Sequence, residues 1–228
     1  MKVLDLFCGL KGWSKAFEDR NHEVITLDIE PRFNPTICKD ILEVDVQEVF
    51  SKYGHFNVIL ASPPCECFSI ASVYRHWDKK NKTAKDGKTI HNIKLVLKTI
   101  ELIQELRPDF WIIENPKGML RKIIGYPHYE ITQCQYGREV MKPTDLWGRL
   151  PKEFNPLKCK PGMNCHERAT RSSRKGVQAI ISSLDKKRNP ELRALIPYGL
   201  SLAVCKACEK ELSIPPKDKS LGILEATL

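Results

Sequence analysis

Cys65 is the residue of this sequence with the clearest potential for chemistry. It follows Pro63-Pro64, which in turn follow the apolar run 56–61 (FNVILA), so two stiff residues lead from a predicted strand into a loop that carries a thiol. A thiol held rigidly at a strand end and open to a ligand suits a nucleophile. The residues alone also allow an ordinary buried cysteine.

Glu114 occupies a similar place after a second apolar run, 110–113 (FWII). A carboxyl group at a strand end can act as a general acid or base if it faces a substrate. On its own, such a glutamate is usually solvated. Beside Cys65 on a neighbouring strand, it becomes a predicted catalytic partner.

A third set of reactive side chains consists of soft metal ligands. Cys134, Cys159, Cys165 and His166 form a Cys₃His set, which is a common tetrahedral zinc site, although their spacing differs from common zinc fingers. A small irregular segment without a core often needs such a staple, so zinc is a predicted cofactor. The CxxC pair Cys205 and Cys208 falls on a predicted helix and is expected to pack there.

Alternating strands and helices position these residues. Predicted strands cover 2–7, 23–28, 56–61, 110–113 and 129–134, and predicted helices cover 13–20, 91–106 and 191–212. The alternation predicts an α/β fold, with a mostly parallel sheet covered by helices on both faces. Ligands bind such sheets at the carboxyl ends of the strands, where Phe7–Gly12, Ser62–Ser69 and Glu114–Gly118 all fall.

Composition narrows the class of protein. The 228 residues are 42% hydrophobic and 29% charged, which is typical of a soluble globular protein. No apolar run approaches the roughly 18 residues of a membrane span, and no secretory signal is evident. We therefore expect an intracellular protein, whose nine cysteines are free thiols, a nucleophile or metal ligands.

The net charge of +9 is concentrated in two segments. Residues 142–188 carry twelve Lys/Arg against four Asp/Glu, and residues 75–98 carry eight against two. Both segments are expected to face a polyanion. Solvated loops without a partner are the alternative.

The segment Pro64-Cys65-Glu66-Cys67-Phe68-Ser69 resembles the Pro-Cys motif of the DNA cytosine-C5 methyltransferases, Pro-Cys-Gln-x-Phe-Ser. The resemblance implies that Cys65 is the nucleophile, that Pro64 supports the loop, and that Phe68 and Ser69 contact the substrate. Glu66 departs from the usual glutamine.

The segment Asp5–Gly12 (DLFCGLKG) is similar to the cofactor loop of that family, with Lys11 in place of a glycine. Gly199–Leu202 resembles its last motif, with Leu200 in place of an asparagine. The resemblance implies a Rossmann-like fold that binds S-adenosylmethionine. The implied cofactor residues are Asp5, Phe7, Gly9, Leu10, Gly12, Asp28, Ile29, Asp40, Ile41 and Ser201.

Glu114-Asn115-Pro116 resembles the Glu-Asn-Val motif of the family, with Pro116 as a departure. The resemblance implies that Glu114 activates a flipped cytosine at N3 and that Asn115 binds the substrate. Arg138, with Lys142 as the other remaining cation, is expected to contact the cytosine O2. The implied reaction is addition of Cys65 to C6, followed by methylation of C5.

The predicted organisation has four parts. Residues 1–141 form the catalytic domain, 142–189 an irregular basic segment that contacts DNA, 190–212 a returning C-terminal helix, and 213–228 a tail. The resemblance implies that the basic loop 70–91 is mobile and closes over DNA, and a disordered surface loop is the alternative. The expected partner is double-stranded DNA, bound by a compact, phage-type monomer in the cytoplasm of a bacterial or phage-infected cell.

Three alternatives remain open at this point. A tRNA-directed branch shares the motifs, so the substrate can be RNA. Pro116 and Leu200 also fit a non-catalytic nucleic-acid-binding relative, as does the reduction of the family's Gln-x-Arg-x-Arg motif to Arg138 and Lys142. Lys11 and Glu66 leave room for a different cofactor or donated group.

Overall fold

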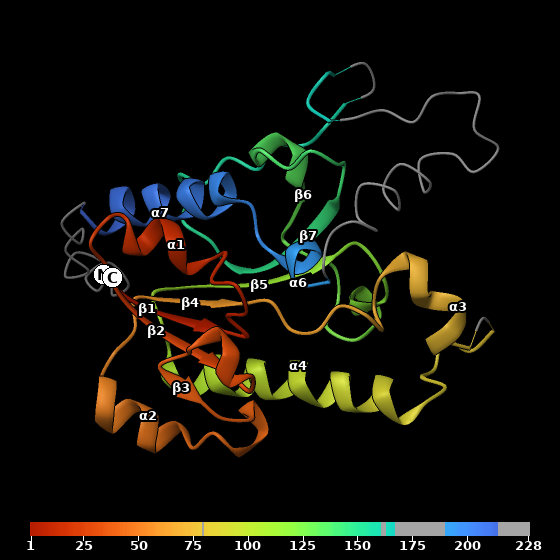
Figure 1. The fold of residues 1–228 in the computed structure, drawn as a ribbon, viewed down its shortest axis with the longest axis horizontal. Helices are drawn as coiled ribbons and strands as arrows, with labels where there is room; N and C mark the ends of the chain where they lie inside the picture. The colour runs from red at the N-terminus through yellow and green to blue at the C-terminus, as the bar shows by residue number, and fades with distance from the viewer. Residues whose placement is uncertain (79, 161–162, 167–189, 214–228) are drawn as a thin grey trace, which may run out of the picture.

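The computed structural model describes residues 1–78, 80–160, 163–166 and 190–213, and its strands and helices alternate (Figure 1). The strands are β1 (Lys2–Leu6), β2 (Glu23–Asp28), β3 (Ile37–Cys38), β4 (Val58–Ala61), β5 (Phe110–Pro116), β6 (Tyr129–Thr132) and β7 (Pro143–Arg149). The α-helices are α1 (Ser14–Glu18), α2 (Val46–Tyr53), α3 (Val73–His76), α4 (Gly87–Leu106), α6 (Pro190–Ala194) and α7 (Tyr198–Leu212). Short 3₁₀ turns are η1 (Pro31–Phe33), η2 (Ile41–Glu43), η3 (Ile70–Ser72), η4 (Met119–Lys122) and η5 (Gln133–Tyr136).

The strands form one seven-stranded sheet in the order β3-β2-β1-β4-β5-β7-β6. The five strands from β3 to β5 are parallel, whereas β7 pairs antiparallel with both β5 and β6. This is a mostly parallel, Rossmann-like α/β sheet, so the predicted fold class is confirmed.

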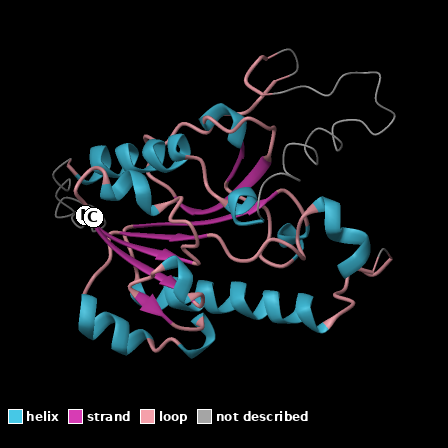
Figure 2. Cartoon of the chain, viewed as in Figure 1, coloured by secondary structure: helices cyan, strands magenta, loops and turns pink. Residues whose placement is uncertain are grey.

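Helices cover both faces of the sheet (Figure 2). On one face, α1 and α7 contribute Phe17, Leu200 and Val204 to a core that contains Val58 and Ile112. On the other face, α2 and α4 pack against the opposite side chains of the same strands, in a core that includes Val49, Leu95, Leu102, Ile59 and Ile113. Because side chains alternate along a strand, each central strand feeds both cores.

Local signals explain where the long helices begin and end. The Asp86 side chain accepts a hydrogen bond from Thr89 N at 2.7 Å and so caps α4, and Asp45 caps α2 by accepting from Gln47 N at 2.8 Å. Arg107 ends α4 in the left-handed region, just before Pro108. Among the described helices, none combines the length and apolarity that crossing a membrane requires.

The prediction of irregular structure from residue 142 is wrong for 143–149, which form β7 between β5 and β6. Pro143, Gly148 and the polar pair Thr144-Asp145 disguise this strand in the sequence. Asp145 is fully buried because Arg121 from η4 donates to it from Nε at 2.6 Å. The remainder of the basic segment, 167–189, and the tail, 214–228, lie outside the described residues.

The basic loop after the Pro-Cys motif is anchored at its centre. Trp77 is buried, packs on Phe68, and donates from Nε1 to Cys67 O at 2.6 Å. Arg75, Lys80, Lys82 and Lys85 remain exposed on either side of this anchor. The exposed basic side chains of the loop therefore lie on either side of a residue that is buried in the core.

Candidate active site

The carboxyl ends of β4 and β5 bring the two predicted catalytic loops together. Ala61 pairs with Ile113 in parallel register, so the residues that follow, Ser62 and Glu114, meet at the sheet edge. Ser62 Oγ donates to Glu114 Oε2 at 3.1 Å. Asn115 Nδ2 donates to Pro63 O at 2.9 Å, which ties the Pro-Cys loop to β5.

A close backbone contact holds the other end of the Pro-Cys loop. Met119 N donates to Phe68 O at 2.7 Å, and Ser69 forms a β-bridge with Gly118. A Cβ atom on Gly118 would lie 2.0 Å from Phe68 O, so a side chain there would push the loop away. Glycine at 118 is therefore required for this approach.

The Cys65 thiol lies in an electrostatic field set by two neighbours. Burial raises the pKa of Cys65, the positive charge of Lys142 opposes that shift, and the negative charge of Glu114 adds to it. The side chain is half-buried. Cys65, Glu114 and Lys142 therefore belong to one site.

Glu114 is suited to hold a proton. Its side chain is only 3% exposed, and burial raises the pKa of the carboxyl group, against the effect of Lys142 and of the hydrogen bond from Ser62. Gln133 Nε2 donates to its other oxygen, Oε1, at 3.2 Å. A carboxyl group that stays protonated to higher pH can donate a hydrogen bond to a ring nitrogen.

Two adjoining cavities lie beside Cys65, and Phe7 and Pro64 line both. The first, called here the Gly9 cavity, has a volume of about 420 Å³ and is lined by Gly9, Leu10, Gly12 and residues 194–196. The second, the Asp40 cavity, has a volume of about 290 Å³ and is lined by Asp28, Ile29, Asp40, Ile41 and Glu66.

Eight of the ten predicted cofactor residues line these cavities. Asp28 is fixed there by hydrogen bonds from Gly9 N at 2.9 Å and Glu30 N at 3.0 Å. The other two predicted residues, Asp5 and Ser201, are buried outside the cavity walls. Asp5 accepts a hydrogen bond from Ser14 Oγ, and Ser201 Oγ donates to Trp13 O, so both support the walls from behind.

Several predicted substrate contacts prove to be supports. Phe68 is fully buried against Trp77 and lines neither cavity, so its predicted contact with substrate is not supported. Asn115 is also fully buried and holds the loop through Pro63. Pro64 lines both cavities, and Ser69 bonds to Ser72 Oγ at 3.0 Å.

Arg138 also forms its hydrogen bonds with other residues of the protein. Its guanidinium donates to Arg193 O at 2.9 Å, Leu195 O at 3.1 Å and Gln133 Oε1 at 3.1 Å. It is 9% exposed, so the predicted contact with cytosine O2 is not supported. The charge of Lys142, the other cation considered from the sequence, lowers the pKa of both Cys65 and Glu114, whereas that of Arg138 lowers the pKa of Glu114.

The sequence did not single out Ser62, Trp13 or Gln133. Trp13 Nε1 donates to Ser62 Oγ at 2.9 Å, and Ser62 in turn donates to Glu114. The position of Ser62 directly before Pro63-Pro64 is a signal that could have indicated it. Gln133 reaches Glu114 from the antiparallel part of the sheet, which local sequence does not reveal.

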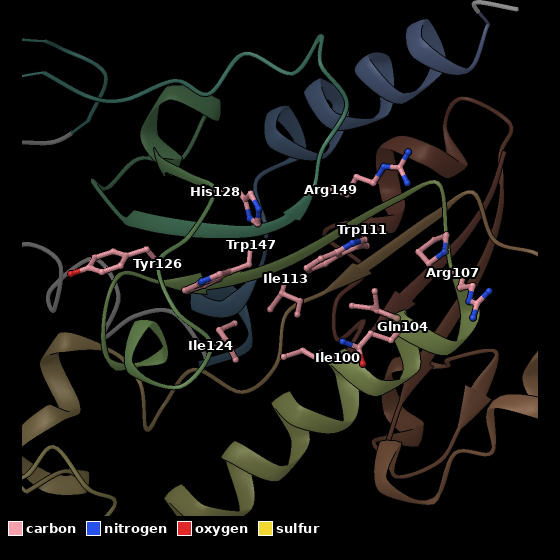
Figure 3. A pocket seen from close by; sticks show the side chains of 12 residues that line it. Ile100, Gln104, Arg107, Trp111, Ile113, Ile124, Tyr126, His128, Trp147 and Arg149 are labelled. Atoms are coloured by element: carbon pink, nitrogen blue, oxygen red, sulfur yellow. The ribbon is translucent and has the colours of Figure 1, made fainter. Parts of the chain in front are cut away.

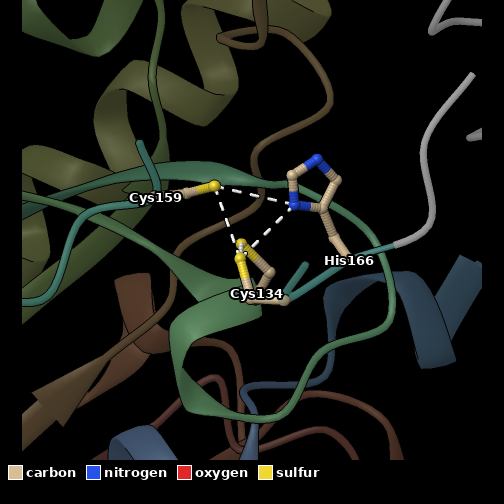
Figure 4. A group of neighbouring side chains, drawn as sticks. Cys134, Cys159 and His166 are labelled. Carbon is tan, nitrogen blue, oxygen red and sulfur yellow. Dashed lines mark hydrogen bonds between the residues drawn. The ribbon is translucent and has the colours of Figure 1, made fainter. Parts of the chain in front are cut away.

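The predicted zinc ligands do come together. Cys134, Cys159, Cys165 and His166 place their ligand atoms within 4.8 Å of one another (Figure 4). Cys134 is buried in η5, and the other three are half-buried in the segment that follows β7.

A further cavity lies away from these residues. Its volume is about 410 Å³, and Trp111 and Trp147 line it between α4, β5 and β7 (Figure 3). It contains none of the predicted catalytic or cofactor residues, because Ile113 faces it and Glu114 points to the opposite face of the sheet.

Comparisons with known proteins identify the family of the chain. Residues 1–133 match the family model described as C-5 cytosine-specific DNA methylase. The chain is 31% identical over 172 residues to a "Probable DNA (cytosine-5)-methyltransferase" of Frog virus 3 (isolate Goorha), covering 72% of this chain and 78% of the relative. It is 26% identical over 131 residues to "Type II methyltransferase M.XorII" of Xanthomonas oryzae pv. oryzae, covering 51% of this chain and 28% of that protein.

Among solved structures, the methyltransferase EhMeth of Entamoeba histolytica superposes with a TM-score of 0.50 at 18% identity, covering 72% of this chain and 57% of that one. The chain thus spans little more than half of that structure. The fold and the strand-edge site define a Rossmann-like methyltransferase. The chain belongs to the C-5 cytosine-specific DNA methylase family.

Proposed function

We propose that this protein methylates the C5 carbon of cytosine in double-stranded DNA, through a covalent bond between Cys65 and C6. The observation that carries the proposal is the meeting of the Pro-Cys loop and Glu114 at adjacent parallel strand ends, joined by Ser62. The relatives named above support DNA as the substrate, and they do not favour the RNA or non-catalytic alternatives.

Family membership implies S-adenosylmethionine as the methyl donor, and the two cavities fit it. Asp28 and Asp40 place carboxylates in the Asp40 cavity, where they can accept hydrogen bonds from ribose hydroxyls and an amino group. Exposed Ile29 offers an apolar surface for a base. The Gly9 cavity adjoins Pro64, beside Cys65. When bound, the cofactor supplies the methyl group.

Cys65 and Glu114 have separate roles in the proposed reaction. A flipped cytosine is a poor electrophile at C6 until N3 is protonated or strongly hydrogen-bonded, and Glu114 can donate that proton. The Cys65 sulfur then forms a bond to C6, and C5 becomes nucleophilic. After methylation, loss of the C5 proton and cleavage of the bond between sulfur and C6 restore the aromatic ring and release Cys65.

Lys142 favours the thiolate form of Cys65. Its charge lowers the pKa of both Cys65 and Glu114. A nearby cation stabilises the thiolate that must attack. We assign Lys142 this electrostatic role toward Cys65, in addition to the contact with cytosine O2 considered from the sequence.

The exposed lysines and Arg75 of the loop between the Pro-Cys motif and α4 are proposed to contact DNA phosphates. The basic residues after β7 are proposed to do the same. We also propose a monomer that acts in the cytoplasm of a bacterial or phage-infected cell and carries one zinc ion on the Cys₃His cluster.

The test is transfer of a labelled methyl group from S-adenosylmethionine to duplex DNA and, separately, to tRNA, by the wild-type chain and by Cys65→Ser. We expect label in duplex DNA only, and only with the wild type. Bisulfite sequencing of the product gives the sequence context. Label in tRNA alone would change the substrate, and label in neither from folded protein that binds S-adenosylmethionine would reject the proposed activity.

A further inference from the structure

The Cys₃His cluster gathers ligands from two places in the fold. Cys134 comes from η5, directly after β6, whereas Cys159, Cys165 and His166 come from the segment that follows β7 (Figure 4). Between Leu150 and Lys160 this segment contains no helix or strand. Hydrogen bonds that join it to β6 and η5 include Thr132 N to Leu157 O at 3.0 Å, Cys159 N to Thr132 Oγ1 at 3.1 Å and Leu157 N to Tyr136 Oη at 2.9 Å.

The ligand distances fit a tetrahedral zinc ion. With Zn–S of about 2.3 Å and Zn–N of about 2.05 Å, ligand atoms lie about 3.8 Å apart for two sulfurs and about 3.6 Å apart for sulfur and nitrogen. Cys165 Sγ lies 3.4 Å from Cys159 Sγ and 3.6 Å from Cys134 Sγ. His166 Nδ1 lies 3.6 Å from Cys159 Sγ and 3.4 Å from Cys165 Sγ.

The same distances argue against disulfide bonds. A disulfide holds its sulfurs about 2.05 Å apart, and all four side chains here point to one centre. Three thiols and one imidazole are the ligands that zinc prefers for a closed structural site.

A second group of possible ligands differs from the Cys₃His cluster in that a cationic side chain already lies against it. His22, Cys205 and Glu209 also lie close together, but Arg20 occupies the carboxylate, donating from Nε at 2.9 Å and from Nη2 at 2.6 Å. The guanidinium supplies the positive charge there. This group therefore carries no metal proposal.

The position of Cys134 links the cluster to the active site. The preceding residue, Gln133, is fully buried, and its Nε2 donates to Glu114 Oε1 at 3.2 Å and to Thr144 Oγ1 at 3.1 Å. A metal bond to Cys134 would fix the turn that carries Gln133. Groups that orient a reacting residue in this way are commonly worth about 10- to 100-fold in activity.

We infer that Cys134, Cys159, Cys165 and His166 bind one structural zinc ion, and that this ion holds Gln133 in position against Glu114. Gln133 is thus a positioning residue. The second half of this inference rests on the proposed methyltransferase activity, whereas the first half does not.

The first half is tested by metal analysis of the full chain, purified without added chelator and then reloaded with zinc. We expect one zinc ion per chain in the wild type, in Cys65→Ser and in the exposed-thiol control Cys38→Ser. Cys165→Ser and His166→Ala should lose it. Cobalt(II) reloading of the wild type should give the absorption of a tetrahedral thiolate site. If the wild-type protein takes up neither zinc nor cobalt, the proposed metal site is wrong. This outcome decides the question even if the ligand variants fail to fold.

The second half is tested by separating kcat from KM. Zinc removal from the wild type is expected to lower kcat about tenfold and to leave the KM for S-adenosylmethionine within about twofold, because its cavities lie on other elements. Gln133→Leu should retain zinc and reproduce the loss of kcat. Equal kcat with and without zinc would overturn the positioning role. Inactivity of zinc-loaded wild type would instead reject the proposed function, with the metal content still deciding the site.

Discussion

The strand-edge site and the cysteine-rich segment 157–166 both bring together residues that are distant in sequence, but by different means. At the strand edge, parallel pairing of β4 with β5 fixes Ser62 beside Glu114, and buried hydrogen bonds complete the arrangement. Segment 157–166 has no such ladder among its described residues, and side-chain ligands converge there instead.

The difference teaches where each region obtains its rigidity. The sheet edge is rigid because its backbone hydrogen bonds and two apolar cores are formed by folding itself. The segment has little apolar surface to bury. A bound ion must therefore supply the stability that a hydrophobic core gives to the rest of the fold. Substitutions at the strand edge should therefore alter the rate of methyl transfer directly. Removal of the ion should first alter how well segment 157–166 is ordered.

The largest expected effect is on chemistry at the strand edge. Cys65→Ser should lower methyl transfer by at least about 1000-fold, because serine is a far weaker nucleophile at neutral pH. Binding of S-adenosylmethionine, followed by calorimetry, should persist, since Cys65 lines neither cavity. The matched Cys38→Ser variant should keep full activity, and a similar loss in both would point to a general role of thiols.

Glu114→Gln should reduce kcat about 100-fold, because an amide cannot transfer a proton to N3. The same change should stabilise the fold above neutral pH, since burial raises the pKa of Glu114 and its ionisation disfavours folding. Kinetics and denaturant unfolding at pH 8 measure the two effects. Lower activity together with lower stability at that pH would contradict this account of the glutamate.

Metal removal tests the other side of the comparison. Lys158 directly precedes Cys159, so trypsin should cut between them once a chelator has removed the ion. For zinc held at roughly 100 times its Kd, the expected increase in cleavage is about 100-fold. Peptide mapping should show that strand-edge sites such as Lys117 remain protected. Simultaneous cutting at both regions would mean that they unfold as one unit.

A smaller effect concerns Asp5, the buried carboxyl group behind the cofactor turn. Burial raises the pKa of Asp5 to about 7, so the folded state keeps a proton that the unfolded state loses above pH 4. Its contribution to stability is complete below about pH 4 and is lost as pH rises to about 7, with a slope of about 1.4 kcal/mol per pH unit. Asp5→Asn should flatten this slope in urea unfolding. If the slope of stability against pH is the same in Asp5→Asn, the pKa of Asp5 is not raised in the folded protein.

The smallest effect is expected at Glu66, where the family usually has glutamine. Its ion pair with Lys88, at 2.8 Å, is more than half exposed on both sides. Glu66→Gln should therefore change the free energy of unfolding by less than about 0.5 kcal/mol in thermal or urea unfolding. A larger loss would show that the Asp40 cavity depends on this pair.

The sequence predicts most of the parallel half of the fold, because β1, β2, β4 and β5 are compact apolar runs followed by a turn or a reactive loop. The two-residue strand β3 has no such run and was not predicted. The positions of Cys65 and Glu114 follow from those strand ends. The antiparallel half was harder to predict. β7 buries Asp145 only because Arg121, 24 residues away, compensates its charge.

The supporting residues of the site were hidden for the same reason. Gln133 reaches Glu114 only after β6 and β7 have paired in register beside β5. Arg138 matched a motif by composition, yet its guanidinium is used to hold residues 193 and 195. Local sequence patterns identified Cys65 and Glu114. The residues that surround them depend on how β6 and β7 pair with β5, which local patterns do not reveal.

The central claim is that the Cys65 sulfur attacks C6 of an everted cytosine with Glu114 beside it. The most direct measurement is mass spectrometry of the protein after incubation with S-adenosylmethionine and duplex DNA that contains 5-fluorocytosine, where fluorine blocks loss from C5 and traps the adduct. The account predicts a covalent protein–DNA product with the modification on the peptide that contains Cys65, absent from Cys65→Ser. An adduct on another cysteine, or none from protein that methylates ordinary DNA, would contradict it.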